Sequence, residues 1–286
     1  MDYSQEKLEG DGYLIKAAPV DDWRRYDELH PVPFYFDFDW LSARHPDLYH
    51  RFALSTIGLM LELDKHVDLS GLDIIDVGAG TGRAAIAAAR RAKSISAVDI
   101  FESVVLYGMD QVRRVGLTNI SYTRGDREHL PFADNSFDAL INSWAELSYP
   151  EAYRVLKSGG YLIRLGAPLE ALCGELTSTL ADVFPNLIQE VAPDDWFDSG
   201  SPEKNTQLDE DRWNGLPVIP PTMLHDFTYI SEYEDSQEAA AIFGRLYGPK
   251  ARQYFLDRQQ SHCAWRLRIE VSRVKKYQEE GGSYLW

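Results

Sequence analysis

The sequence predicts an α/β fold, and three observations support that prediction. Residues 73–83 read DIIDVGAGTGR, an apolar run followed by a glycine-rich stretch and then by a run rich in Ala, Ile and Arg. This order is typical of a buried strand, a tight turn and a helix. A second apolar run ends at Asp99, and three more strand-like runs follow before residue 166. Strands that alternate with helical stretches indicate a layered α/β domain.

The glycine-rich turn narrows the choice of ligand. Glycine lets the backbone turn sharply and lets a ligand approach the main chain closely. A dinucleotide fingerprint has its third glycine one residue later, where this chain has Arg83. The Gly-Lys-Ser/Thr run of a phosphate-binding loop does not occur in the sequence. A plain strand–helix turn without a ligand stays open at this point.

Asp99 stands at the tip of a strand expected over 94–98. A carboxylate at that position can accept two hydrogen bonds from a ribose diol. It can equally cap a helix over 101–115, and the residues alone leave both interpretations open. Further strands are expected over 120–123, 139–142 and 161–165.

Four segments between about residues 70 and 165 carry a family resemblance. They read DVGAGTGR, AVDI, GDREHLPFADNSFDALINS and RVLKSGGYLI, in that order. The succession resembles the class I S-adenosylmethionine-dependent methyltransferases, in particular the branch that acts on small molecules. The resemblance implies a Rossmann-like seven-stranded sheet, parallel except for the last strand, which is antiparallel, with helices on both faces.

The resemblance also implies roles for ten residues toward the cofactor S-adenosyl-L-methionine. Gly78, Ala79 and Gly80 would pass under its methionine and ribose parts. Asp76 would support the turn and the cofactor's amino group, and Asp99 would accept the ribose hydroxyls. The other five would meet the adenine ring or the methionine end: Ile100 on the adenine face, Asp126 and the Arg127 main chain at the adenine amine, and Asn142 and Ser143 at the methionine amine or the methyl group.

Two features depart from the family pattern. Arg127 stands where the family usually has a small or apolar residue, so its side chain points to solvent or clamps an anionic group. The stretch 138–154 is shorter than in most relatives, which brings Trp144, Glu146 and Tyr149 near the methyl group. These three are candidate acceptor contacts; the alternative is that both rings pack and the glutamate faces water.

Catalysis of methyl transfer rests mainly on holding a nucleophile in line behind an electrophilic methyl carbon. A general base is needed only for an acceptor that arrives protonated. The candidates are Glu146, His129 and His225, with a structural or surface role preferred for His129. The seven histidines show no Cys/His cluster with zinc-like spacing, so no metal site is expected. The acids at 194–198 and 209–211 are interpreted as a solvated charge run rather than a cation site.

Composition indicates a soluble enzyme. The net charge of −16 argues against a nucleic-acid partner, because phosphate neutralisation needs clustered Lys and Arg. No apolar run is long enough to cross a bilayer. Two cysteines, Cys173 and Cys263, and an N-terminus unlike a signal peptide suit a cytoplasmic location. The oligomeric state is left open.

The chain is long for this core, so additions are expected on both sides of it. Residues 1–69 form an N-terminal cap, in which Leu48, Phe52, Leu59 and Leu63 predict an amphipathic helix over 46–67. The aromatic stretch 30–40 precedes this helix. It either roofs the active site, with Tyr35 as a weak substrate contact, or packs on the core as a strap.

The cofactor-binding core is expected over 70–168 and a second addition over 169–225. This addition comprises a helical stretch that begins near residue 168 and ends at 191, followed by an acidic loop over 192–225. Two tryptophans in the loop favour a lid over disorder. The core resumes over 226–286, with a strand over 227–233, a helix over 236–259 and a last strand over 264–274.

Three functions remain open on the sequence. The first is a small-molecule methyltransferase with an O, N, S or C acceptor. The second is a protein methyltransferase whose acidic loop docks a basic segment. The third is a cofactor-binding partner subunit that has lost catalysis. The intact glycine turn, Asp99 and Asp126 argue against lost cofactor binding, although not against lost transfer.

Overall fold

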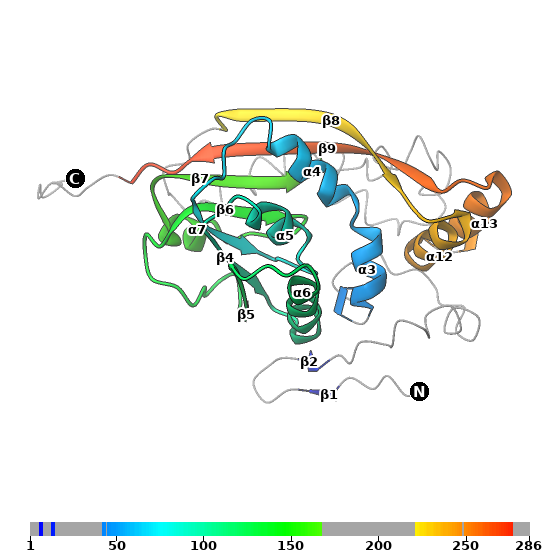
Figure 1. Ribbon diagram of the computed structural model, residues 1–286, viewed down its shortest axis with the longest axis horizontal. Helices are drawn as coiled ribbons and strands as arrows, with labels where there is room; N and C mark the ends of the chain where they lie inside the picture. Colours follow the sequence, from blue (N-terminus) through cyan, green and yellow to red (C-terminus); the bar gives the residue numbers. More distant parts are fainter. Residues whose placement is uncertain are drawn as a thin grey trace, which may run out of the picture.

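A seven-stranded mixed sheet forms the centre of the molecule (Figure 1). The computed structural model describes residues 6–7, 13–14, 42–43, 45–167, 221–247 and 249–276. The strand order is β5-β4-β3-β6-β7-β9-β8. The strands are β3 (Asp73–Val77), β4 (Ser94–Asp99), β5 (Ile120–Arg124), β6 (Phe137–Ser143), β7 (Leu156–Gly166), β8 (Met223–Glu232) and β9 (His262–Arg273).

The direction of the strands confirms the expected topology. The pairs β3–β4, β3–β6, β4–β5 and β6–β7 are all parallel. The last strand, β9, runs antiparallel to both of its neighbours, β7 and β8. Because the five strands from β3 to β7 share one direction, their carboxyl ends meet at one edge of the sheet, where α/β sheets bind ligands.

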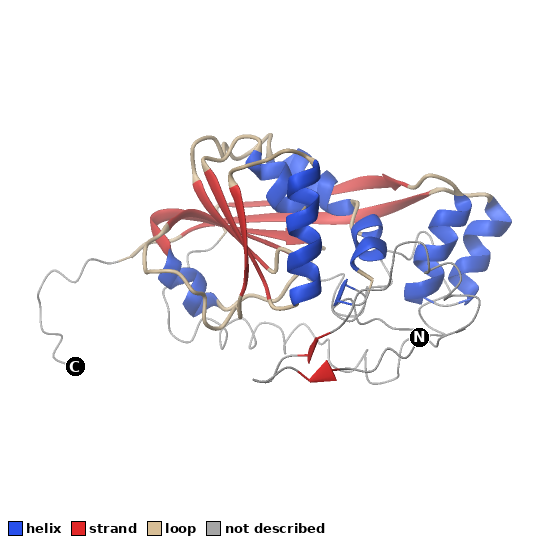
Figure 2. Cartoon of the chain, turned by 60° about the horizontal axis from the view of Figure 1, so that its bottom comes forward, coloured by secondary structure: helices blue, strands red, loops and turns tan. Residues whose placement is uncertain are grey.

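Helices pack against the sheet, and two more helices lie at one end of its longest strands (Figure 2). Helices α4, α5 and α6 pack on strands of the sheet, and α7 lies against β7. Helix α3 contacts both α6 and α12. The helices are α3 (Pro46–Phe52), α4 (Ser55–Leu63), α5 (Arg83–Ala89), α6 (Glu102–Arg114), α7 (Tyr149–Val155), α12 (Ser236–Tyr247) and α13 (Pro249–Arg258). A separate two-stranded pair joins β1 (Glu6–Lys7) to β2 (Tyr13–Leu14).

The alternation of side chains along β3 divides the core into two layers. Ile74 belongs to the cluster that packs against α4 and α5, whereas Ile75 and Val77 belong to the cluster under α7. Both isoleucines are fully buried. Burying such a side chain contributes about 1.5–3 kcal/mol. Since Asp76 follows the same alternation, its carboxylate faces the α5 side of the sheet.

Two predicted helices are each divided in two. The helix expected over 46–67 is broken between Phe52 and Ser55. The break lets α3 pack on α6 and α12 while α4 packs on β8 and β9. The four apolar residues on which the prediction depended are nonetheless buried: Leu48, Phe52, Leu59 and Leu63.

The helix expected over 236–259 is divided before Pro249. Proline donates no backbone hydrogen bond and disfavours a helical residue before it. Strand bounds also differ from the prediction: β7 begins at Leu156 rather than 161, and β8 at Met223 rather than 227.

Several predictions fall outside the described residues. They are the aromatic stretch 30–40 with Tyr35, the helix over 168–191, most of the acidic loop 192–225, and Cys173. The division into 1–69, 70–168, 169–225 and 226–286 stays a prediction. Within the described part of the chain, no helix has the length and apolar character that a membrane span requires.

Candidate functional site

The turn after β3 is built by backbone hydrogen bonds. The N–H groups of Gly78 and Ala79 both donate to the carbonyl of Val98 in β4, each at 2.9 Å. Gly78, Gly80 and Gly82 have φ angles of 71°, 54° and 90°, which residues with a Cβ adopt only at a cost. The backbone of the turn therefore requires the glycines that the sequence places there.

Two of these glycines also allow close packing. A Cβ at Gly78 would collide with the side chain of Ala145, in the loop after β6. A Cβ at Gly82 would collide with the hydroxyl of Tyr122 in β5. The loops after β3 and β6 thus approach each other directly at the carboxyl edge of the sheet.

Asp99 connects the end of β4 to the glycine turn. Its Oδ2 accepts a hydrogen bond from the N–H of Gly80 at 2.9 Å, and its Oδ1 accepts one from Phe101 at 3.0 Å. Helix α6 has Phe101, not Asp99, as its N-cap residue, so the helix-cap interpretation is wrong in its simple form.

Asp76 lies fully buried beneath the turn. Its two oxygens have no hydrogen-bond partner of good geometry among the described residues. Burial, with a smaller contribution from the Asp99 carboxylate, raises the pKa of Asp76 to about 7, against an opposing effect of the Ala85 backbone. The role in supporting the turn that the family resemblance implies for Asp76 stays a prediction.

A cavity of about 480 Å³ opens at the carboxyl ends of β3, β4, β5 and β6. Seven of the ten residues predicted to meet the cofactor line it: Gly78, Gly80, Asp99, Ile100, Asp126, Arg127 and Ser143. The other three, Asp76, Ala79 and Asn142, are buried and are not part of its lining. Asn142 donates from Nδ2 to the carbonyl of Val77 at 3.0 Å and so connects β6 to β3.

The loop after β5 carries Asp126 and is closed by its own turn. Asp126 accepts a hydrogen bond at Oδ1 from the N–H of Glu128, at 2.9 Å, and its carbonyl accepts one from His129 at 3.1 Å. These contacts present the Asp126 carboxyl group at the cavity, where the resemblance places the adenine amine.

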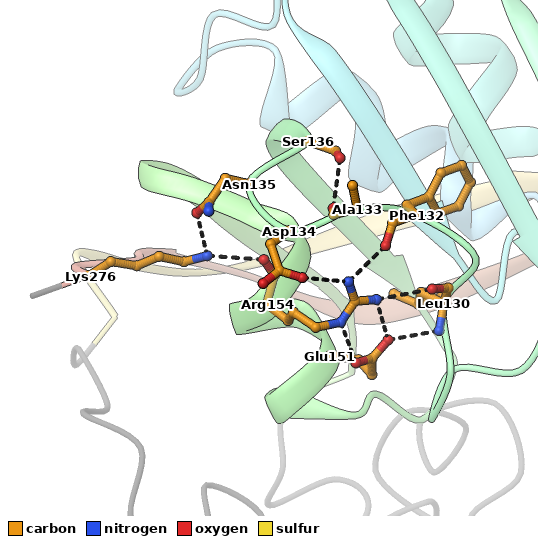
Figure 3. Close-up of polar contacts among 9 residues, drawn as sticks. All are labelled: Leu130, Phe132, Ala133, Asp134, Asn135, Ser136, Glu151, Arg154 and Lys276. Carbon is orange, nitrogen blue, oxygen red and sulfur yellow. Dashed lines mark hydrogen bonds and ion pairs between the residues drawn. The ribbon is translucent and has the colours of Figure 1, made fainter. Parts of the chain in front are cut away.

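Arg154 of α7 holds the next part of this loop (Figure 3). Its guanidinium donates to the carbonyls of Phe132 and Leu130, at 2.7 and 2.9 Å. It also pairs with Asp134 at 2.9 Å and with Glu151 at 2.6 and 2.7 Å. Arg154 thus connects residues 130–134 of the loop to helix α7.

The loop after β6 forms one side of the cavity. The hydroxyl of Ser143 is buried and has no hydrogen-bond partner among the described residues. Trp144 has a φ of 58° and lies edge-on to Trp265, with the ring centroids 6.4 Å apart. The guanidinium of Arg127 pairs with the carboxylate of Glu146. This ion pair connects the loops after β5 and β6 at the edge of the cavity.

Only some of the candidate bases and acceptor contacts line the cavity. Glu146 lines the cavity, with a side chain that is 74% exposed, whereas His129 and His225 do not. His129 is exposed in the loop after β5. Tyr149 is buried at the start of α7, with the Arg164 guanidinium 5.7 Å from its ring centroid, so it packs rather than facing the cavity.

Residues of α3 also reach the site, which the sequence did not indicate. Tyr49 lines the cavity beside Gly80. His50 shares a 2.9 Å hydrogen bond between its Nδ1 and the Thr81 hydroxyl, and Arg83 donates to its carbonyl. Burial, with the nearby cations of Arg83 and Arg51, lowers the pKa of His50 to about 3. The helical spacing of Leu48 and Phe52 predicted that this helix has a buried face. It did not predict that Tyr49 and His50 would contact the glycine turn.

Comparison with known proteins agrees with this geometry. Residues 75–164 match the family model described as a methyltransferase domain. Over residues 75–164 the chain is therefore similar to the S-adenosylmethionine-dependent methyltransferases, whose cofactor is S-adenosyl-L-methionine.

Two curated relatives illustrate the extent of the similarity. A ubiquinone/menaquinone biosynthesis C-methyltransferase from Haemophilus ducreyi is 30% identical over 150 residues, which are 48% of this chain and 54% of the relative. A phthiotriol/phenolphthiotriol dimycocerosates methyltransferase from Mycobacterium ulcerans is 31% identical over 148 residues, 48% of this chain and 49% of the relative. The chain spans about half the length of the curated relatives it matches.

One solved structure is also similar in outline. It is the geranyl diphosphate C-methyltransferase from Streptomyces coelicolor A3(2), in complex with Mg²⁺, geranyl diphosphate and S-adenosyl-L-homocysteine. It aligns with a TM-score of 0.45 and 15% identity over 75% of this chain and 76% of that chain. The fold assignment here depends on the strand order and direction of the chain itself.

Proposed function

We propose that this chain, with its class I methyltransferase domain, transfers a methyl group from S-adenosyl-L-methionine to a small-molecule acceptor. The observation that carries the proposal is the cavity at the carboxyl edge of the sheet. Its walls combine an open glycine turn with the carboxyl groups of Asp99 and Asp126 and the hydroxyl of Ser143.

The residues present fit the cofactor. Glycines 78 and 80 leave the backbone of the turn uncovered, so a ligand can lie against it. Asp99, nearly buried at the end of β4, would hold the ribose hydroxyls. Asp126 would accept the adenine amine beside Ile100, and the Ser143 hydroxyl, buried without a partner in the described structure, would take a polar group at the methionine end.

Methyl transfer requires the protein mainly to position the acceptor relative to the cofactor. When bound, S-adenosyl-L-methionine supplies a methyl carbon made electrophilic by a positively charged sulfur. The protein then has to align the acceptor and keep water out, and such positioning is worth roughly 7–11 kcal/mol in the best cases. Trp144 and Tyr49 give the cavity apolar surface for this purpose. Glu146 is the cavity-lining carboxylate that we assign as the base for an acceptor that arrives protonated.

A small acceptor accords with the surroundings of the cavity. The Arg127–Glu146 ion pair joins two loops at its edge, which narrows the approach for a folded protein substrate. The names of the two curated relatives also refer to small molecules, a quinone and a lipid. The acceptor atom, O, N, S or C, stays open.

Cofactor binding is tested by titration calorimetry with S-adenosyl-L-methionine. We expect binding by the wild type and a loss of about 1–3 kcal/mol in Asp99→Ala, because the ribose hydroxyls lose a charged acceptor. Asp110→Ala, in an exposed position on α6, is the matched control and should bind as the wild type does. Absence of heat from the wild type would overturn the proposal, and unchanged affinity in Asp99→Ala would remove the role of Asp99.

Transfer is tested by measuring S-adenosyl-L-homocysteine formed with a panel of quinols, phenols and hydroxylated lipids. We expect turnover with at least one small acceptor. Labelling of proteins alone, with no small acceptor accepted, would instead favour the protein methyltransferase. Cofactor binding with no transfer to either class would favour the partner-subunit interpretation.

A further inference from the structure

We propose a second site, outside the cofactor pocket, at which Glu62, His66 and His225 bind a divalent metal ion of the zinc class. The three side chains meet where α4 packs on the edge strand β8. One potential ligand atom from each lies within 4.8 Å of those from the other two. None of the three lines the cofactor cavity.

The spacing of the donor atoms suits a tetrahedral ion. The Oε1 atom of Glu62 lies 3.1 Å from Nε2 of His225 and 3.5 Å from Nε2 of His66. Zinc binds imidazole nitrogen and carboxylate oxygen at about 2.0–2.2 Å, so two ligand atoms on a tetrahedron stand about 3.3–3.6 Å apart. The two distances therefore need only small side-chain movements to admit an ion.

The fold holds the three donors from two directions. Glu62 lies in the last turn of α4, and His66 lies in the turn that follows the helix, with its Nε2 3.5 Å from Oε1 of Glu62. His225 comes from β8, more than 150 positions later in the chain. Helix α4 is seated on β8 at Gly58, where a Cβ would collide with the ring of Tyr229. Gly58 is one helical turn before Glu62, so helix and strand are in close contact next to the proposed site. Figure 1 shows α4 beside β8 and β9.

Neighbouring groups orient the ligands. Lys65 binds the second carboxylate oxygen of Glu62, Oε2, at 2.5 Å, which leaves Oε1 toward the two imidazoles. The ring of His225 stacks on Phe227 at 5.7 Å with an interplanar angle of 16°. Outer contacts of this kind hold metal ligands in a fixed orientation.

The donor set selects the class of metal. Two imidazoles and one carboxylate suit zinc, nickel or copper better than calcium or magnesium, which prefer oxygen. The side chains of His66, His225 and Glu62 are 31%, 35% and 18% exposed. Water can therefore reach the ion and complete its coordination, as it does where three protein ligands hold zinc. Because the ligands come from α4, from the turn after it and from β8, the ion would connect the helix to the edge strand of the sheet.

Zinc calorimetry on chelator-treated protein without a polyhistidine tag tests the site. We expect one saturable equivalent per chain in the wild type and at least tenfold weaker binding in His66→Ala and His225→Ala. His262→Ala, at another exposed histidine, is the matched control and should bind as the wild type does. Co²⁺ should give the visible absorption of a tetrahedral ion in the wild type and lose it in Glu62→Gln.

Thermal unfolding gives a second measurement. At a zinc concentration a hundredfold above Kd, the wild-type midpoint should rise by about 5–10 °C, and that of His225→Ala should not. No saturable binding by the wild type, or equal binding by His66→Ala, would overturn the site. Calorimetry with S-adenosyl-L-methionine on the same variants should give wild-type affinity, which separates this proposal from the proposed function.

Discussion

The two sides of the proposed cofactor pocket are held by different kinds of contact. The turn side, residues 78–82 with Asp99, is held mainly by hydrogen bonds of the backbone N–H groups to Val98 and to the Asp99 carboxylate. The loop side, residues 125–136 and 143–146, is held by side chains, with Arg154 beneath and the Arg127–Glu146 pair at the edge. Asp99 is only 9% exposed, whereas the side chain of Glu146 is 74% exposed.

This difference indicates which half of the pocket tolerates amino-acid substitutions. Backbone conformation and close packing on the turn side leave no room for added atoms, so it suits the part of the ligand that stays constant, the cofactor. The exposed side chains at the edge of the loop side, those of Arg127 and Glu146, can be exchanged at small cost to folding. We therefore propose that this edge meets the acceptor, while Asp126 and Ser143 of the same loops meet the cofactor. We therefore expect substitutions on the turn side to have larger effects than substitutions on the loop side.

The largest effect is expected at Gly78. Gly78→Ala forces a Cβ into positive φ and into Ala145, and should lower the free energy of unfolding by about 2–4 kcal/mol. Gly71 has nearly the same φ, 73°, but open space around it. Gly71→Ala should therefore cost only about 1–2 kcal/mol. Urea unfolding of both variants measures the difference, and equal losses would show that packing against Ala145 is unimportant.

The buried carboxyl group of Asp76 should affect the pH dependence of stability. Its pKa is about 7 in the folded chain against 3.8 as the ordinary value. The folded state therefore binds the extra proton between about pH 4 and 7, and this contribution to stability is lost as pH rises through that window. Asp76→Asn has no titrating carboxyl group at this position, so its stability should not fall in this way. The loss in the wild type is at most about 1.4 kcal/mol of unfolding free energy per pH unit.

His50 acts in the opposite direction over a similar window. Its pKa of about 3 lies below the ordinary 6.5, so its contribution to stability rises with pH between those values. The two residues oppose each other in the wild type. Urea unfolding between pH 4.5 and 7.5 should show stability rising more steeply with pH in Asp76→Asn than in the wild type. A parallel pair of profiles would mean that Asp76 is ionised throughout.

A smaller effect is expected where Arg154 supports the loop side. Arg154→Met removes hydrogen bonds to two carbonyls and two carboxylates and should cost about 1–3 kcal/mol. It should also weaken binding of S-adenosyl-L-methionine, because the loop that carries Asp126 loses its support. Arg114→Met breaks an exposed pair with Asp110 and should cost about 0.3–0.5 kcal/mol. If the two variants unfold alike, the network in Figure 3 does not stabilise the loop.

The smallest effect on stability is expected for the ion pair at the edge of the cavity. Arg127→Gln should change the free energy of unfolding by less than about 1 kcal/mol, since both side chains are exposed. Its effect should fall on the KM for the acceptor, because the change frees Glu146 and widens the approach. Steady-state kinetics with cofactor and acceptor varied separately measures this, and a change confined to the cofactor KM would place Arg127 on the other half of the pocket.

Much of the turn side was readable from short stretches of sequence. A glycine at positive φ, an apolar strand and an acid at a strand tip are each set by interactions within a few residues. Strand β3 is the apolar run DIIDV that predicted a buried strand. The bends in the helical segments were not readable in the same way. Residues 46–67 have continuous helical periodicity, but the segment is broken after Phe52, and α3 and α4 pack on different partners on either side of the break.

By itself, then, the sequence determined the alternation of strands and helices, the glycine turn and the strand-tip acids, because local backbone preference and side-chain periodicity decide them. Only the tertiary structure decided which distant groups meet. It placed Tyr49 over the turn, Tyr149 in the core and His225 beside Glu62. Such contacts depend on how separate elements pack, and no local pattern in the chain records that.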